Sequence, residues 1–143
     1  MKLFRIICLL MTTTALLSSS LMAGAIFARA HHTDEDFSVK EYNDFHRVLH
    51  PLQHEALPRK DFQRIRSSAG ELVKRGEAIV KLGVPAGTAA RNVEEFRQEL
   101  TKFSDALVKF SEHAKGGTGE QVEGSFSAVH DSFEMLAGML PRK

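Results

Sequence analysis

Histidine is the residue type with the most chemical potential in this 143-residue sequence, and all seven histidines follow residue 30. His46 and His50 are four positions apart, and so are His130 and Glu134. On an α-helix, side chains at this spacing project from one face about one turn apart and can bind one ion together. Three imidazoles and a carboxylate suit zinc, copper, nickel or cobalt far better than calcium or magnesium.

The other histidines are open to more than one interpretation. His54 continues the four-residue series beyond His50, but on a straight helix it points away from the core unless a kink at Pro51 swings it back. His113 falls near the end of a helical segment, where a cationic ring suits the helix dipole. His31-His32 would become the amino terminus after signal cleavage. An amino-terminal histidine can chelate copper through its amine and ring, although the position favours a disordered tail.

The first thirty residues have the order of a secretory signal peptide. Lys2 and Arg5 precede a mostly apolar run over residues 6–27, and residues 28–30 read Ala-Arg-Ala, with small residues at the two positions that a signal peptidase recognises. The alternative is an uncleaved membrane anchor, since the run is long enough to span a bilayer. We expect cleavage and a periplasmic or secreted domain of residues 31–143, with membrane contact only if the segment stays uncleaved.

Composition excludes several classes of function. Residues 31–143 contain 16 lysines and arginines against 18 acids, so they offer no basic face for nucleic acid. The single cysteine, Cys8, lies in the signal segment, which excludes disulfides, cysteine nucleophiles and covalent haem attachment from the exported part. Non-covalent haem between His130 and a facing histidine is a minor alternative. We expect no enzyme, because the sequence has no nucleophile–base pair, glycine-rich phosphate loop or Glu-x-x-His pair.

Helical periodicity runs through the exported part. Apolar residues recur at spacings of three and four in four segments, and no segment shows the alternation of a strand. The segments are separated by breakers at Pro58, residues 83–87 and residues 116–119. An all-α, up-down-up-down four-helix bundle is therefore predicted after the signal peptide. Its first helix should start at residues 33–36 and should kink or restart at Pro51; the alternative is a longer hairpin that folds differently around Pro51.

The first and last helices of such a bundle are antiparallel neighbours, which brings matching shoulders of their apolar stripes together. His46 and His50 occupy the same shoulder positions on one helix that His130 and Glu134 occupy on the other. In the expected register, His46 is level with residues near 134 and His50 is level with His130. The pattern therefore predicts a metal site on this flank.

Two short strings resemble motifs of periplasmic metal sensors of the cobalt–nickel resistance type. Residues 50–58, HPLQHEALP, resemble their first-helix motif, and Val129-His130 with Phe133-Glu134-Met135 and Ala137-Gly138 resembles their last-helix motif. The resemblance implies a small all-helical protein, exported or membrane-anchored, that binds a transition metal between its outer helices. It implies His50, His54 and His130 as ligands. The family places a methionine four residues after the last-helix histidine, where this chain has Glu134.

The sequence thus predicts an exported protein that binds zinc, copper, nickel or cobalt and acts as a metal buffer, resistance factor or sensor. Its candidate ligands are His46, His50, His54, His130 and Glu134. Helical phase favours His46 with His50, whereas the resemblance favours His50 with His54. The alternative function is a metal-free periplasmic adaptor or chaperone-like bundle, whose histidines are surface polar residues and whose partner is a second copy or another periplasmic protein.

Overall fold

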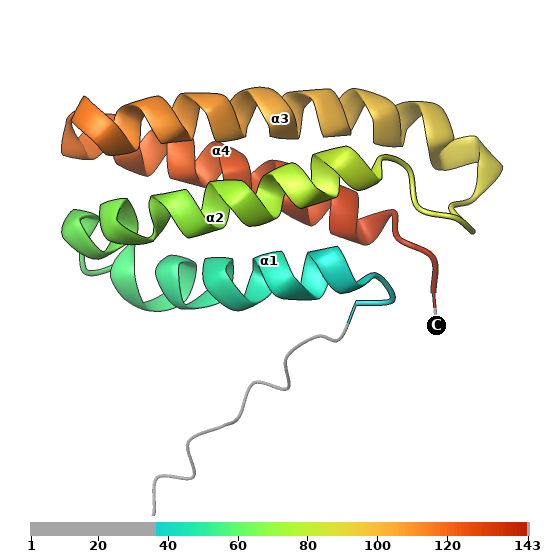
Figure 1. Ribbon diagram of the computed structural model, residues 1–143, viewed down its shortest axis with the longest axis horizontal. Coiled ribbons are helices and arrows are strands. Elements are labelled where there is room, and N and C mark those ends of the chain that lie inside the picture. The colour runs from blue at the N-terminus through green and yellow to red at the C-terminus, as the bar shows by residue number, and fades with distance from the viewer. Residues whose placement is uncertain (1–36, 143) are drawn as a thin grey trace, which may run out of the picture. The chain divides into compact units, whose positions relative to one another are not determined.

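The computed structural model describes residues 37–142, and every regular element in that part of the chain is helical (Figure 1). Successive long helices run in opposite directions and pack against each other, which confirms the predicted all-α, up-down-up-down bundle. No helix within residues 37–142 has both the length and the apolar character needed to cross a membrane. The elements are α1 (Lys40–Pro51), the π-helical turn η1 (Leu52–Ala56), α2 (Phe62–Leu82), the 3₁₀ turn η2 (Ala90–Asn92), α3 (Val93–Gly116) and α4 (Gly119–Gly138).

The first described helix starts at Lys40, with Val39 in an extended conformation, whereas the expected start at residues 33–36 lies outside the described residues. The side chain of Asn43 bonds back to Phe37: its Oδ1 accepts from the Phe37 amide at 2.7 Å, and its Nδ2 donates to the Phe37 carbonyl at 2.9 Å. These two bonds tie the preceding chain across the first turn of the helix. Residues 37–39 are not helical, and the start predicted at residues 33–36 stays a prediction.

The helix does not stop at Pro51. Proline has no N–H to donate, so an α-helix loses one backbone hydrogen bond at this residue. The chain continues as the wider turn η1, in which the Leu57 amide donates to the Leu52 carbonyl at 2.9 Å. Leu52 and Ala56 are both buried. The expected kink or restart thus takes the form of a π-turn that keeps apolar side chains facing the core.

Aromatic rings fill the space between α1 and α4. The buried ring of Phe133 lies 4.8 Å from that of Phe45 and 5.7 Å from that of Tyr42, measured between ring centres. Phe37 forms a T-shaped contact with Phe133 at 5.7 Å between ring centres, and Phe103 of α3 forms one with Phe45 at 5.4 Å. Ring pairs at these separations add stabilisation beyond the burial of their area. The core between the first and last helices is therefore built around Phe133.

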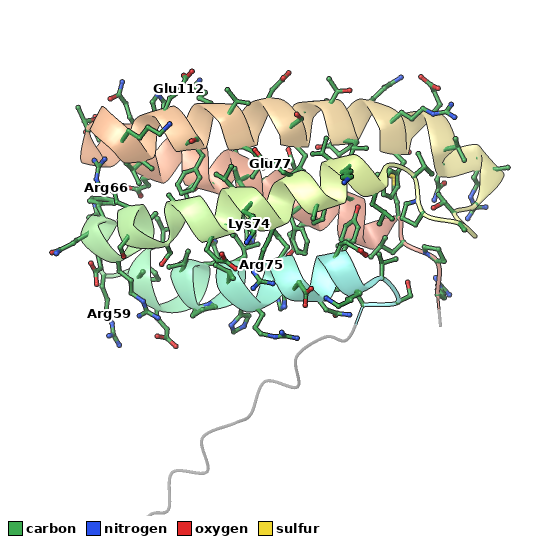
Figure 2. All side chains as sticks on the ribbon, in the orientation of Figure 1. Arg59, Arg66, Lys74, Arg75, Glu77 and Glu112 are labelled. Atoms are coloured by element: carbon green, nitrogen blue, oxygen red, sulfur yellow. The ribbon has the colours of Figure 1, made fainter. Side chains whose placement is uncertain are left out.

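The turn between α3 and α4 is held by side chains that satisfy backbone groups at the helix ends. Thr118 and Gln121 form a capping box at the start of α4. Arg66 reaches across from α2 at the same end of the bundle (Figure 2). Its guanidinium donates at 2.6–2.9 Å to the carbonyl oxygens of His113, Ala114 and Gly117. A charged donor thus satisfies orphan carbonyls at the end of α3.

Two glycines of α2 provide a matched test of the packing between α2 and α3. A Cβ at Gly76 would lie 2.6 Å from Leu107 Cδ1, whereas a Cβ at Gly70 would meet nothing within 4 Å. Gly70→Ala should raise the free energy of unfolding by up to about 1 kcal/mol, because alanine favours the helix. Gly76→Ala should lower it by about 1 kcal/mol, because the buried Leu107 must move. Urea unfolding followed by circular dichroism measures both, and an equal gain from both would contradict this close approach.

Tyr42 supplies a second test, because it is the only tyrosine in a chain without tryptophan. Its side chain is fully buried, and its hydroxyl has no hydrogen-bond partner among the described residues. Burial raises the pKa of Tyr42 far above its ordinary value of 10.0. The unfolded chain loses this proton at a pH where the folded protein keeps it, so stability should fall as the pH rises above about 10.

Tyr42→Phe should raise the free energy of unfolding by about 1 kcal/mol, because it removes an unsatisfied buried hydroxyl. The ultraviolet absorbance of the phenolate reports the ionisation of Tyr42 directly, since no other tyrosine contributes. The signal should appear only when the protein unfolds at alkaline pH. A phenolate signal near pH 10 in the folded protein would show that the ring is accessible to water.

Candidate metal centre

Three imidazoles form a line along α1 and η1, which we name the histidine row: His46, His50 and His54. The ring centres of His46 and His50 are 5.2 Å apart, and those of His50 and His54 are 4.4 Å apart. Imidazole nitrogens bind transition metals at about 2.0–2.1 Å, so two rings that share one ion have centres about 5 Å apart. Both neighbouring pairs in the row therefore have a spacing compatible with chelation.

The π-turn η1 determines where His54 lies. Each residue of an α-helix advances by 100°, so a four-residue series drifts by about 40° at every step. A π-turn is wider and each of its residues advances by a smaller angle, which reduces this drift between His50 and His54. His54 is exposed, whereas His46 and His50 are half-buried. The turn after Pro51 thus brings His54 beside His50 while its ring stays at the surface.

His46 connects the row to α4. Its ring stacks on Phe133 with centres 6.1 Å apart and planes 13° apart, and Phe37 contacts it edge-on at 5.4 Å. Phe133 therefore lies beside His46, close to the predicted register in which His46 is level with residues near 134. The row consequently lies on the shoulder of α1 that faces α4.

The opposite shoulder of α1 faces α2 through charged side chains. Arg75 of α2 lies between the two helices (Figure 2), with its guanidinium 3.9 Å from the Asp44 carboxylate. A hydrogen bond from Lys40, together with the nearby arginines, holds the pKa of Asp44 below its ordinary range despite the opposing effect of desolvation. The polar contacts to α2 and the histidine row thus use different sides of the same helix.

The second group of predicted ligands lies on α4, and we name it the α4 pair: His130 and Glu134. The Nε2 of His130 is 4.0 Å from the Glu134 carboxylate, and its Nδ1 is 3.2 Å from Asp131 Oδ1. When Nδ1 carries the proton, it donates to Asp131 and leaves the Nε2 lone pair available on the side of Glu134. The two potential metal-binding atoms of the α4 pair are thus 4.0 Å apart.

The histidine row and the α4 pair belong to different helical elements. His130 precedes Phe133 by one turn, so on an antiparallel helix it lies level with the stretch between His46 and His50. Within residues 37–142, however, no three His, Cys, Asp or Glu side chains are grouped to hold a metal ion. Aromatic rings fill the seam between α1 and α4.

Sequence reasoning missed two features of this region. Asp131 directly follows His130, and this His-Asp pair is a signal that could have indicated an orienting carboxylate. The clamp between Phe37 and Asn43 had no comparable signal, because it depends on a turn that is not helical. His113 lies apart from both groups, with its Nδ1 3.0 Å from the Gln121 carbonyl at the junction of α3 and α4.

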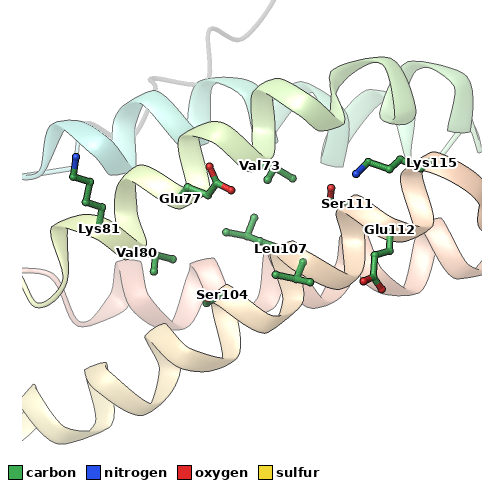
Figure 3. Close-up of a pocket in the computed structure, with 10 residues that line it drawn as sticks. Val73, Glu77, Val80, Lys81, Ser104, Leu107, Ser111, Glu112 and Lys115 are labelled. Carbon is green, nitrogen blue, oxygen red and sulfur yellow. The ribbon is translucent and has the colours of Figure 1, made fainter.

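A groove of about 430 Å³ runs between α2 and α3 (Figure 3) and is lined by no histidine. Its apolar lining includes Val73, Val80 and Leu107. Val108, which also lines it, is 58% exposed. Charged side chains stand around it, namely Glu77, Lys81, Glu112 and Lys115. This surface is the principal alternative to a site based on the histidines.

Function must be inferred from these residues themselves. Comparison with models of known protein families, with curated protein sequences and with solved structures finds no match.

Proposed function

We propose that this protein binds a divalent transition-metal ion through the histidine row, with His50 as the central ligand. The observation that carries the proposal is the spacing of three successive imidazoles, at 5.2 Å and 4.4 Å between ring centres. His50 belongs to both neighbouring pairs. It is therefore a ligand whether His46 or His54 completes the chelate.

The donor chemistry supports a borderline metal. The only cysteine of the chain is Cys8, so nitrogen and oxygen donors dominate the rest of the sequence. Imidazole suits zinc, copper, nickel and cobalt. Together with the signal-like first thirty residues and the resemblance to periplasmic metal sensors, this chemistry favours an exported metal buffer, resistance factor or sensor.

The α4 pair is the nearest further source of ligands in this proposal. An ion held by two imidazoles of the row has coordination positions left over, since zinc in proteins takes four ligands. His130 and Glu134 lie across the seam at the level of the row, and their donor atoms are 4.0 Å apart. Rotation of these side chains toward α1 would let both helices bind one ion.

Metal titration tests the proposal directly. The full chain is expressed with its own N-terminal segment, purified after export, and titrated calorimetrically with Zn²⁺, Cu²⁺, Ni²⁺ and Co²⁺. We expect binding of one ion per chain. The melting temperature should rise with metal concentration, because a ligand that binds only the folded state stabilises it by about 2.7 kcal/mol at a hundredfold excess over Kd.

Two alanine variants and one control identify the ligands. His50→Ala should abolish tight binding, and His130→Ala should weaken it. His113→Ala is the matched control, because that ring contacts the Gln121 carbonyl away from the row, and it should leave binding unchanged. Bound Cu²⁺ should also quench the fluorescence of Tyr42, whose ring contacts Phe37 and Phe133 beside His46. Equal binding by the wild type and His50→Ala would overturn the proposal.

Asp131 should act as a positioning residue for His130. Partners that fix the second nitrogen of a metal-bound histidine commonly change affinity by 10- to 100-fold. Because Asp131 is 79% exposed, we expect Asp131→Ala to weaken binding by about tenfold, at the lower end of that range. Asp105→Ala, at another exposed helical aspartate, is the control. NMR of the histidine nitrogens should show a loss of the Nδ1–H form of His130 in Asp131→Ala alone.

The groove between α2 and α3 favours the second candidate function, an interaction module. An exposed valine beside an apolar floor and a charged rim is typical of a surface that contacts another protein. That function predicts that His50→Ala leaves binding of the partner protein intact. Substitutions in the groove, such as Val108→Asp, would abolish it.

A further inference from the structure

Three charged residues of α2 form a stripe beside the groove between α2 and α3. We name it the α2 stripe: Lys74, Glu77 and Lys81, all of them exposed. At 100° per residue, the three positions fall within about 60° of the circumference of the helix. Glu77 and Lys81 line the groove (Figure 3). The stripe therefore presents the order positive, negative, positive along α2.

The helix on the other side of the groove carries the opposite order of charge. Its exposed residues Asp105, Lys109 and Glu112, which we name the α3 stripe, also fall within about 60° of the circumference of their helix. Glu112 lines the groove. This stripe presents the order negative, positive, negative along α3.

The spacings of the two stripes match when the helices run in opposite directions. Members of the α2 stripe are three and then four residues apart, whereas those of the α3 stripe are four and then three residues apart. A helix with one stripe, laid antiparallel on a helix with the other, therefore meets an opposite charge at every position. The resulting pairs are Lys74 with Glu112, Glu77 with Lys109, and Lys81 with Asp105.

The two stripes flank an apolar surface. Val73 and Val80 of α2 are half-buried in the lining of the groove, and Val108 of α3 is 58% exposed beside them. The ion pairs that α2 and α3 form within residues 37–142 involve residues outside the stripes, such as Lys102 with Glu99. An apolar centre between charged margins is the usual arrangement of an interface between proteins.

A two-fold axis that runs along the groove would satisfy both stripes at once. Within one chain α2 and α3 are antiparallel, and the close approach of Gly76 to Leu107 places the two stripes at nearly the same level of the bundle. The axis therefore lays α2 of one copy antiparallel on α3 of the other, with their stripes at nearly the same level. Both copies use the same surface, so each charge pair forms twice.

We infer that the groove between α2 and α3 binds a second copy of this chain, with each α2 stripe on the α3 stripe of the other copy. The inference is independent of the proposed metal site, because the histidine row lies on the shoulder of α1 that faces α4. With 21 residues in α2, the shared face is about 30 Å long and two helices, or about 20 Å, wide. Its area of about 600 Å² is below the roughly 800 Å² per partner of a standard interface, so we expect a dimer that exchanges with the monomer.

Charge reversal tests the inference because it changes which copies can pair. The full chain is purified after export and kept in a chelator, and sedimentation over a range of protein concentrations gives the dissociation constant of the dimer. Glu77→Lys and Lys109→Glu each place like charges opposite each other twice in the dimer. Each should weaken it at least about tenfold. The double variant Glu77→Lys/Lys109→Glu should recover the wild-type dissociation constant.

A mixture of the two single variants gives the most specific result. In a mixed dimer every position of both stripes faces an opposite charge, so Glu77→Lys and Lys109→Glu should dimerise with each other although each dimerises poorly alone. Glu95→Lys reverses an exposed charge of α3 outside the stripe and is the matched control, which should dimerise like the wild type. Val108→Asp should weaken the dimer, because it places a charge in the apolar centre.

Three outcomes would overturn the inference. A wild type that stays monomeric at the highest concentration would leave the groove to a different protein. A dimer that persists unchanged in both single variants would place the interface on another surface. Single variants that lose the dimer, without recovery in the double variant or the mixture, would show that the two stripes do not pair. Because a chelator is present throughout, none of these results decides whether the histidine row binds metal.

Discussion

The contact on which this region of the bundle depends is the packing of Phe133 between α1 and α4. The ring of Phe133 stacks on Tyr42, tilts against Phe45, meets Phe37 in a T-shaped contact and lies nearly parallel to His46. The same ring thus forms the core of the seam and the wall against which the histidine row rests. Phe133 therefore takes part both in the packing of the seam and in the placement of the His46 ring.

The fold could be predicted from the sequence because each helix carries its own periodic stripe. Tyr42, Phe45, Leu49 and Leu52 follow one such stripe, and all four are buried. The stripe does not determine the backbone conformation at the ends of the helix. The start of α1 at Lys40 depends on the bonds between Asn43 and Phe37, and the π-turn depends on how the chain accommodates Pro51. Both features depend on local hydrogen bonds, which the spacing of apolar residues does not indicate.

The candidate site could be predicted only in part, for a related reason. Spacing within one helix is fixed by helical geometry, so the alignment of His46 with His50 and the proximity of His130 to Glu134 follow from sequence positions alone. The distance between helices depends on the side chains that fill the gap. Large aromatic rings occupy the seam, and within residues 37–142 no three potential ligands are grouped around one point.

The π-turn η1 determines the direction of both exposed and buried side chains in the first helical segment. A π-turn is an α-helical turn that contains one additional residue without a break in the helix. Loss of one residue from Leu52–Ala56 would restore an α-helical phase and turn everything downstream by about 100°. His54 would leave the side of His50, and Ala56 would leave the core. The spacing of the histidine row and the core packing in this segment therefore cannot change independently in evolution: an insertion or deletion here alters both at once.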